Sequence, residues 1–456
     1  MRRPTSNTRK NSSDVSDCDT EKNIGDLQVN ERYLEKGIES TTNSSEDLSS
    51  SVNHGVPDGG LRAWGVVVGA FLIQFCTSGY VCSFGVFQDY YTRVYMTAYS
   101  PSTISWIGSV NTFILLAVGL MGGRLYDRGY VVSLLYGGAF LMSLSLFMLS
   151  FAKPNQYAVI IATQGIGMGL GGGITYIPSF AIVSQYFDKK RGMVLPLVAA
   201  GVSAGAALTP IMINNLLQKR NLAFAVTTRI HAGMMTVFLI IACLLIKPRL
   251  PPPKTHASLM VCFKKFSKDK AYVIMTTGFT FFGLGLFFPI FFLQLAATTH
   301  GLDKEFAFYS LVILNSCSSA GRILSALVAH KTRVDWMAVG SATVCGCIIF
   351  AFLKIGSALS VVLVGVIYGF AFGILVATMA PLTNMLTDNP AELGLRLGIA
   401  FAWTGLGELV GPPIMGALLT GYHWWRPAVF SGLLLLAAAA CFTAVSIIVR
   451  NRMALI

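Results

Sequence analysis

The sequence predicts an all-α membrane protein with twelve transmembrane helices in two pseudo-symmetric bundles of six. Of its 456 residues, 54% are apolar and only 12% are charged, and the mean hydropathy is +0.63. Soluble proteins carry about 25% charged residues. The apolar residues also form blocks of about 20, the length that crosses a bilayer as a helix. These observations argue against a soluble enzyme, a disordered protein and a disulfide-rich secreted scaffold.

Residues 1–56 precede the first apolar block and are rich in serine, threonine, asparagine and acidic residues. Such a segment buries too little apolar surface to offset the entropy that its chain would lose on folding. We therefore expect a disordered tail before the first helix.

Twelve apolar blocks follow the tail. In lipid every backbone polar group must pair within its own segment, so each block is expected to be a helix. The predicted spans are 64–87, 104–123, 131–151, 157–183, 193–216, 226–246, 272–295, 307–329, 335–353, 358–380, 397–420 and 427–449.

The loops between the blocks predict the orientation. The side that carries both termini holds 17 lysines and arginines, and the other side holds 8. Because basic residues concentrate on the cytoplasmic side, both termini are expected in the cytosol, with the plasma membrane as the location. The net charge of +13 therefore indicates topology rather than nucleic-acid binding.

The longest connection between spans, 247–271, contains three consecutive prolines and a lysine cluster. It is expected to be a cytosolic linker between an N-terminal bundle, 57–246, and a C-terminal bundle, 272–456. The lysines either attract anionic lipid or serve only to set the topology.

The two bundles resemble one another weakly. Gly123-Arg124 near the end of the second span is echoed by Gly321-Arg322 in the eighth, 198 residues later. Arg191 precedes the glycine-rich fifth span as Arg396 precedes the eleventh. An offset near 200 residues indicates two six-helix repeats, the plan of the major facilitator fold.

Three stretches resemble a known family. They are PDGGLRAW at 57–64, YFDKKRGMVLPLVAAGVSAG at 186–205 and GRLYDRG at 123–129. The first two are similar to signatures of fungal monocarboxylate-transporter-like proteins, and the third resembles the general facilitator loop. The residues that match the first two signatures are Asp58, Gly59, Gly60, Trp64, Tyr186, Phe187, Lys189, Arg191, Ala200, Gly201 and Gly205; Val194 and Pro196 depart from them.

Physical chemistry suggests roles for these residues. The Asp58 carboxylate is placed to accept unpaired N–H groups at the start of the first helix, and Trp64 is placed to lie at headgroup level. Two groups of charged residues are expected to form a cytosolic conformational latch or, alternatively, to provide only topology-determining charge: Asp127 and Arg128, and Lys189, Lys190 and Arg191.

Arg322 lies inside the eighth span, where charge is costly and usually functional. The resemblance implies that it binds a substrate carboxylate, for which a guanidinium is suited by bidentate hydrogen bonding. The alternative is an arginine whose head group reaches the membrane interface. The family pairs this arginine with an aspartate and a lysine, whose positions here are Ser318 and Cys82. Lactate-type proton symport is therefore not expected.

Glu408 is the one acidic residue that the sequence places at mid-membrane, because Asp89 is expected at the outer end of the first span. A carboxyl group in that setting can carry a proton through a transport cycle, or it can be a protonated packing residue.

Other polar residues on the spans are candidates to line a substrate site or to form inter-helix hydrogen bonds. The preferred four are Asn111, Tyr176, Asn315 and Tyr368. The glycine run at 165–173 lacks the preceding strand that nucleotide binding requires. No metal cluster or catalytic set is apparent in the sequence, and no cofactor is expected.

The sequence thus predicts a secondary-active carrier of a small organic molecule, monocarboxylate-like or a secondary metabolite. We expect it to act as a monomer by proton-coupled alternating access. The alternatives are a vitamin-type uptake carrier and a non-transporting sensor on the same fold.

Overall fold

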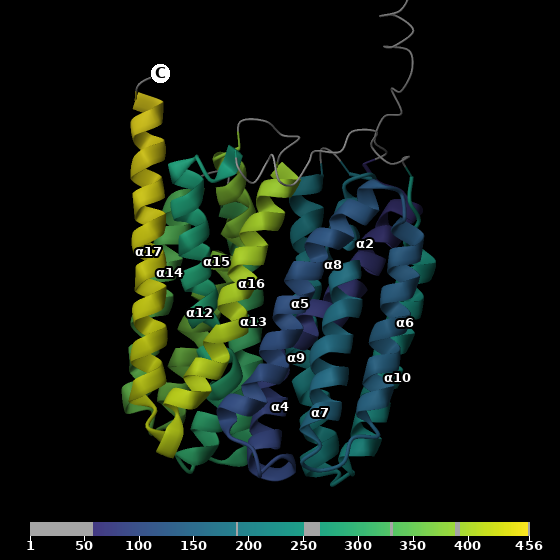
Figure 1. Ribbon diagram of the computed structural model, residues 1–456, viewed down its shortest axis with the longest axis vertical. Helices are drawn as coiled ribbons and strands as arrows, with labels where there is room; N and C mark the ends of the chain where they lie inside the picture. Colours follow the sequence, from purple (N-terminus) through teal and green to yellow (C-terminus); the bar gives the residue numbers. More distant parts are fainter. Residues whose placement is uncertain (1–57, 188–189, 250–264, 329–331, 388–392, 455–456) are drawn as a thin grey trace, which may run out of the picture. The chain divides into compact units, whose positions relative to one another are not determined.

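The computed structural model describes residues 58–187, 190–249, 265–328, 332–387 and 393–454. The predicted tail, 1–56, and most of the predicted linker lie outside these residues. The segment Pro57–Ile456 forms one compact unit, and its described residues are built from helices that run side by side (Figure 1).

The first half of the described chain contains six long helical segments, several of them interrupted by a π-helical turn (η). The segments are Leu61–Tyr95, formed by α2 (Leu61–Gln74), η1 (Phe75–Gly79), α3 (Tyr80–Cys82), α4 (Phe84–Tyr90) and η2 (Tyr91–Tyr95); α5 (Pro101–Asp127); α6 (Val131–Leu149); α7 (Tyr157–Ile160), η3 (Ile161–Gly167) and α8 (Met168–Val183); α9 (Arg191–Asn214) with η4 (Asn215–Lys219); and α10 (Phe224–Leu245).

The second half contains six more. They are α12 (Lys270–Thr299), α13 (Lys304–Val328), α14 (Val334–Ile349) with the 3₁₀ turn η5 (Phe350–Lys354), α15 (Ala358–Met385), α16 (Leu393–Leu418) with the 3₁₀ turn η7 (Thr420–Tyr422), and α17 (Trp425–Ala454).

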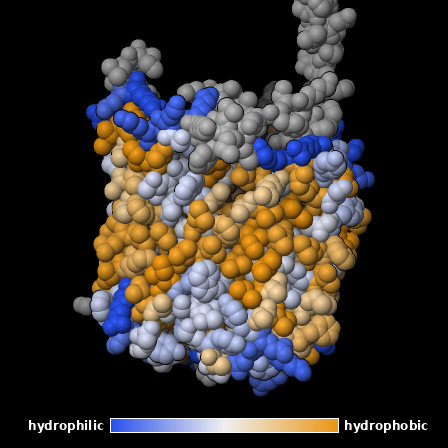
Figure 2. Space-filling view, in the orientation of Figure 1, coloured by the Kyte–Doolittle hydropathy of each residue, from blue (hydrophilic) through white to orange (hydrophobic). Residues whose placement is uncertain are grey.

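Eleven of these segments are long and apolar enough to cross a membrane among the residues described. The twelfth, α16, has 26 residues but carries Arg396, Glu408 and the pair Pro412-Pro413. Figure 2 shows an apolar band between two polar ends on the visible face. The predicted all-α fold with membrane-spanning helices is confirmed.

Several helices are longer than hydropathy predicts. The first continues to Tyr95 rather than residue 87, and α12 begins at Lys270 rather than residue 272. A hydropathy window ends where polar residues begin, whereas a helix continues as long as its backbone and polar side chains find partners. We call the end of the bundle at Leu61 and Ala454 the terminal face, and the other end the opposite face.

Gly201 and Gly205 allow the first helix to lie against α9. A Cβ atom at Gly205 would lie 3.0 Å from the Cα atom of Gly79, and one at Gly201 would lie 3.0 Å from the carbonyl carbon of Phe71. Small residues spaced by four let two helix backbones approach closely in a membrane. This packing accounts for both signature glycines.

Three helix pairs join the two halves: α5 with α16, α9 with α13, and α4 with α12. The Ser102 hydroxyl donates to the Pro413 carbonyl at 2.7 Å, and the Asn315 amide donates to the Ala206 carbonyl at 3.1 Å. Figure 1 shows α5 beside α16 and α9 beside α13 in the middle of the molecule. The residues between these pairs are therefore shared by both halves.

Candidate functional site

Four polar side chains from four helices gather where the halves meet, with Cys82 and Tyr176 in electrostatic range of both Arg322 and Glu408. Arg322 on α13 interacts with Tyr176 on α8 and with Cys82 on α3, and Glu408 on α16 also acts on Cys82 and Tyr176. Two of these helices belong to each half. We call these four residues the central group.

Arg322 lies deep in the protein but keeps part of its surface accessible. Its guanidinium carbon lies 5.9 Å from the centre of the Phe372 ring, and its Nε atom has no hydrogen-bond partner. Among the described residues it forms no ion pair within 4.0 Å. A buried guanidinium without a carboxylate partner is suited to bind an anion.

Ser318 lies one helical turn before Arg322 and is also buried, with an unpartnered hydroxyl. Tyr176 is partly accessible, and its hydroxyl interacts with Ser78 on the first helix. Buried polar atoms without partners are costly, so such atoms indicate a group that is bound or a function that needs them. Arg322 and Ser318 offer two adjacent donors to a ligand.

Glu408 is 7% exposed, and its Oε2 atom has no hydrogen-bond partner. It lies on the face of α16 that packs on α12, where Gly407 and Gly411 allow close approach. No ion pair joins Glu408 to Arg322 in the described structure. A carboxylate without a cationic partner is costly in such a setting, whereas the protonated acid costs far less.

The remaining predicted substrate residues hydrogen-bond to backbone carbonyls. Asn111 donates to the Gln164 carbonyl at 2.6 Å, and Tyr368 donates to the Leu286 carbonyl at 2.5 Å. Asn315 bridges the halves through Ala206. In this structure they serve as inter-helix hydrogen bonds, the alternative that the sequence left open, and contact with substrate stays a prediction for them.

The two family signatures meet at the terminal face. The Trp64 and Phe187 rings lie 5.7 Å apart in an edge-to-face contact, and Trp64 remains 38% exposed. The Tyr186 hydroxyl donates to the Lys247 carbonyl at 2.8 Å. The start of the first helix and the segment before α9 therefore form one structural unit.

Asp58 does not occupy the capping position of the first helix. That position is Gly60, whose φ of +96° favours glycine. Asp58 lies two residues earlier, and its Oδ1 accepts from the Lys190 backbone N–H at 3.4 Å. Gly59 and Gly60 let the chain turn between these two positions.

The predicted latch falls mostly outside the described part of the structure. Lys189 lies outside it, as do the side chains of Asp127 and Arg191. Arg128 is exposed at the terminal face. The latch stays a prediction.

Sequence reasoning placed Asp89 at the outer end of the first span but did not predict its burial. It is fully buried inside the helix and bonded to Arg93, Gln294 and Thr298. Only the hydrophilic pair Gln88-Asp89 in an otherwise aromatic stretch could have signalled a buried polar contact.

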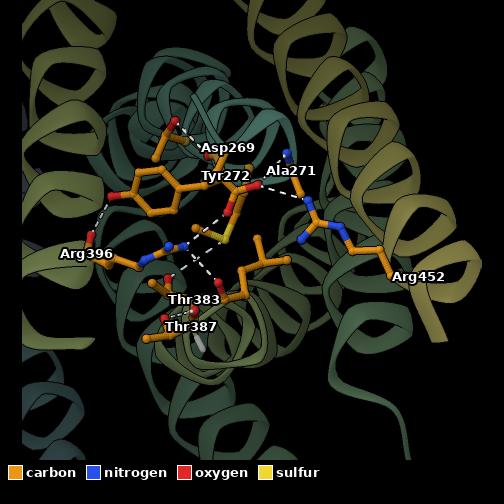
Figure 3. A network of polar contacts seen from close by, with 10 residues as sticks. Asp269, Ala271, Tyr272, Thr383, Thr387, Arg396 and Arg452 are labelled. Atoms are coloured by element: carbon orange, nitrogen blue, oxygen red, sulfur yellow. Dashed lines mark hydrogen bonds and ion pairs between the residues drawn. The ribbon is translucent and has the colours of Figure 1, made fainter. Parts of the chain in front are cut away.

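Arg396 was expected in a loop and is instead 4% exposed in the first turn of α16. Its guanidinium binds Asp269 at 3.2 Å and the Leu386 carbonyl at 2.7 Å (Figure 3). It also lies over the Phe266 and Tyr272 rings. Arg452 on α17 contacts the same aspartate. This network holds the ends of α12, α15, α16 and α17 together.

Comparison with known proteins identifies the family. The Major Facilitator Superfamily profile matches residues 66–391. The chain belongs to this superfamily. It is a multi-pass membrane transport protein and not an enzyme.

Fungal transporters are among its relatives. It is 36% identical over 367 residues to the aspyridones efflux protein apdF of Emericella nidulans, covering 80% of this chain and 74% of that protein. It is 36% identical to the MFS-type transporter 1 of Ophiocordyceps sp., covering 80% of each. Identity to the agnestins efflux protein AgnL12 of Paecilomyces divaricatus is 32% over 380 residues, covering 82% and 85%.

Solved structures agree on the fold. A D-xylose–proton symporter superposes with a TM-score of 0.65 at 17% identity, covering 83% of this chain and 96% of that one. A point mutant of the nucleoside transporter NupG gives a TM-score of 0.66 at 15% identity, covering 84% and 99%.

Proposed function

We propose that this superfamily member exports a small anionic organic molecule, a secondary metabolite, by proton-coupled alternating access. It acts as a monomer, because both halves that flank the central group belong to one chain. The names of the aspyridones and agnestins efflux proteins support export as the direction.

One observation carries the substrate class. Arg322 presents an unpartnered guanidinium nitrogen beside the unpartnered Ser318 hydroxyl, and the Phe372 ring lies next to it. These groups suit an acidic function attached to an apolar or conjugated body. Tyr176 from the other half supplies a further polar contact.

We also propose that the chain belongs to the monocarboxylate-transporter-like group. The support is the pair of signatures that meet at Trp64 and Phe187. Cys82 and Ser318 occupy the positions of that group's lysine and aspartate. A substrate other than a simple monocarboxylate would account for both replacements.

We place the terminal face in the cytosol of a plasma-membrane protein, because the basic loops lie at that face. An epitope tag after residue 456 should become accessible to antibody only when cells are permeabilised. Staining of intact cells would reverse the orientation.

Transport itself is tested in inside-out vesicles from cells that express the chain. An acid lumen should drive accumulation of fungal organic acids from a panel that includes neutral methyl esters of the same compounds. The acids should compete with one another, and the esters should not, because only the acids pair with Arg322. Equal transport of acids and esters would contradict the anionic substrate, and no transport of any compound would contradict the export proposal.

A further inference from the structure

The opposite face holds a buried polar contact between the halves that the transport site does not use. Asp89 on the first helix accepts a hydrogen bond from the Gln294 amide at 3.0 Å and one from the Thr298 hydroxyl at 3.4 Å, both on α12. Asp89 is 0% exposed and Gln294 is 2% exposed. A charged group buried between two domains must be paired, and here the second half supplies part of the pairing.

The counter-ion of Asp89 comes from its own helix. Arg93, four residues later, binds both carboxylate oxygens, including Oδ1 at 2.6 Å. This pair therefore moves with the first helix. The polar links from this pair to the second half are the bonds from Gln294 and Thr298, together with the electrostatic contact between Arg93 and Tyr422 on η7.

An apolar layer lies between this contact and the central group. The centres of the Phe84 and Phe291 rings are 4.9 Å apart across the halves. Both rings pack against Gly108 of α5, where a Cβ atom would overlap them. Gly85 lies against Leu311, where a Cβ atom would come within 3.1 Å of its side chain. Cys82 lies on the side of the layer that faces the central group. Asp89 lies about 10 Å further along the helix, at about 1.5 Å per residue.

In this conformer the apolar layer and the polar contact close the path from the central group to the opposite face. Opening that path requires α4 to move away from α12, which removes the Gln294 and Thr298 bonds while Arg93 stays with Asp89. Hydrogen bonds to a charged group are stronger than neutral ones. Their loss is thus part of the free-energy difference between the two conformations.

We propose that Asp89, held by Gln294 and Thr298, is the gate residue of the opposite face and biases the carrier toward the conformer closed there. This inference rests on alternating access as the proposed function. It adds a residue and a contact that the substrate and proton sites do not include.

Cys82 provides a reporter for the test. It is a buried member of the central group, so a membrane-impermeant thiol reagent reaches it from the opposite face only when the gate opens. The experiment uses full-length protein in which the other eight of the nine cysteines are serine. Reagent is applied separately to each side of sealed vesicles, with Cys82→Ser as the blank.

We expect Asp89→Asn, Gln294→Leu and Thr298→Val to raise the labelling rate of Cys82 from the opposite face. The first two should raise it about tenfold, the smallest effect expected for the loss of a hydrogen bond to a charged group. The double variant Asp89→Asn/Gln294→Leu should add little to Gln294→Leu alone, because without the Gln294 amide there is no bond at this position for the Asp89 charge to strengthen.

Gln88→Leu is the matched control. Gln88 is the preceding residue and equally buried, but its bonds run to Pro101 and Ser105 within its own half. If no Asp89, Gln294 or Thr298 variant labels faster than Gln88→Leu, the contact is structural and the gate assignment is wrong. Equal increases from both sides would indicate general loosening and would also overturn it. Labelling needs no substrate, so this result is independent of the transport assay.

Discussion

Arg322→Lys is expected to lower the transport efficiency for an acidic substrate about tenfold to a hundredfold, with a normal amount of protein in the membrane. The guanidinium can give an acid two parallel hydrogen bonds, whereas an ammonium group is a point charge. Each hydrogen bond to a charged group contributes about 1.5–3 kcal/mol. Vesicle uptake at several substrate concentrations, normalised to the amount of carrier, measures the effect.

Arg229→Lys is the control. Arg229 on α10 also lies over an aromatic ring, with its guanidinium carbon 5.4 Å from the Phe151 centre, but it is exposed on the surface of the first half. Its replacement should leave transport unchanged. Normal transport by Arg322→Lys would favour the rival interpretation, in which the Arg322 head group only reaches toward the membrane interface.

The length of the apolar blocks was enough to predict the helices and their order, since a bilayer requires spans of a narrow length range. Arg322 and Glu408 were found for the same reason, because a charge inside an apolar block is conspicuous. Tyr176 was among the predicted substrate residues, but its place beside these two, and that of Cys82, was not predictable. Cys82 and Tyr176 join them through the packing of helices that are far apart in the sequence, and no local pattern encodes that packing.

Asp89 and Arg396 show where the reasoning fails. A hydropathy window assigns a charge near the end of a block to solvent. Both side chains are instead buried by partners at a distance: Gln294 is 205 residues from Asp89, and Asp269 is 127 residues from Arg396. The burial of a terminal charge depends on whether tertiary structure supplies a partner. A single sequence does not contain that information.

The signature motifs lie between these two cases. Trp64, Phe187, Gly201 and Gly205 could be singled out by resemblance. The contact between the motifs, and the use of Gly60 rather than Asp58 at the helix start, required the structure.

Glu408→Gln is expected to abolish pH-driven accumulation while leaving substrate exchange. A carrier without a nucleotide site must use an ion gradient or the gradient of the substrate. Glu408 is a buried member of the central group, and no described residue forms an ion pair with it. The acid is therefore stable in its neutral form when enclosed, and it can release its proton when the site opens to water.

The control for that experiment is Asp335→Asn. Asp335 on α14 is 1% exposed, but it is ion-paired with Arg333 at 2.8 Å and bonded to Ser446, away from the central group. Once normalised to the amount of protein, this variant should accumulate substrate as the parent does. The comparison separates proton coupling from the general cost of altering a buried carboxylate.

The glutamine side chain matches a carboxyl group in shape and hydrogen bonding but cannot take up or release a proton, so the variant represents a carrier that lacks its proton step. It should fold, bind substrate at Arg322 and exchange labelled for unlabelled substrate across the membrane. It should no longer respond to an imposed pH step, because no proton leaves or joins it during the cycle. Vesicle accumulation with and without the step, measured beside counterflow exchange, distinguishes the two activities.

Accumulation by the glutamine variant equal to that of the parent under the pH step would make Glu408 a packing residue and would place coupling at another group. Loss of both accumulation and exchange would indicate instead that Glu408 is needed for substrate binding or for the conformational change itself.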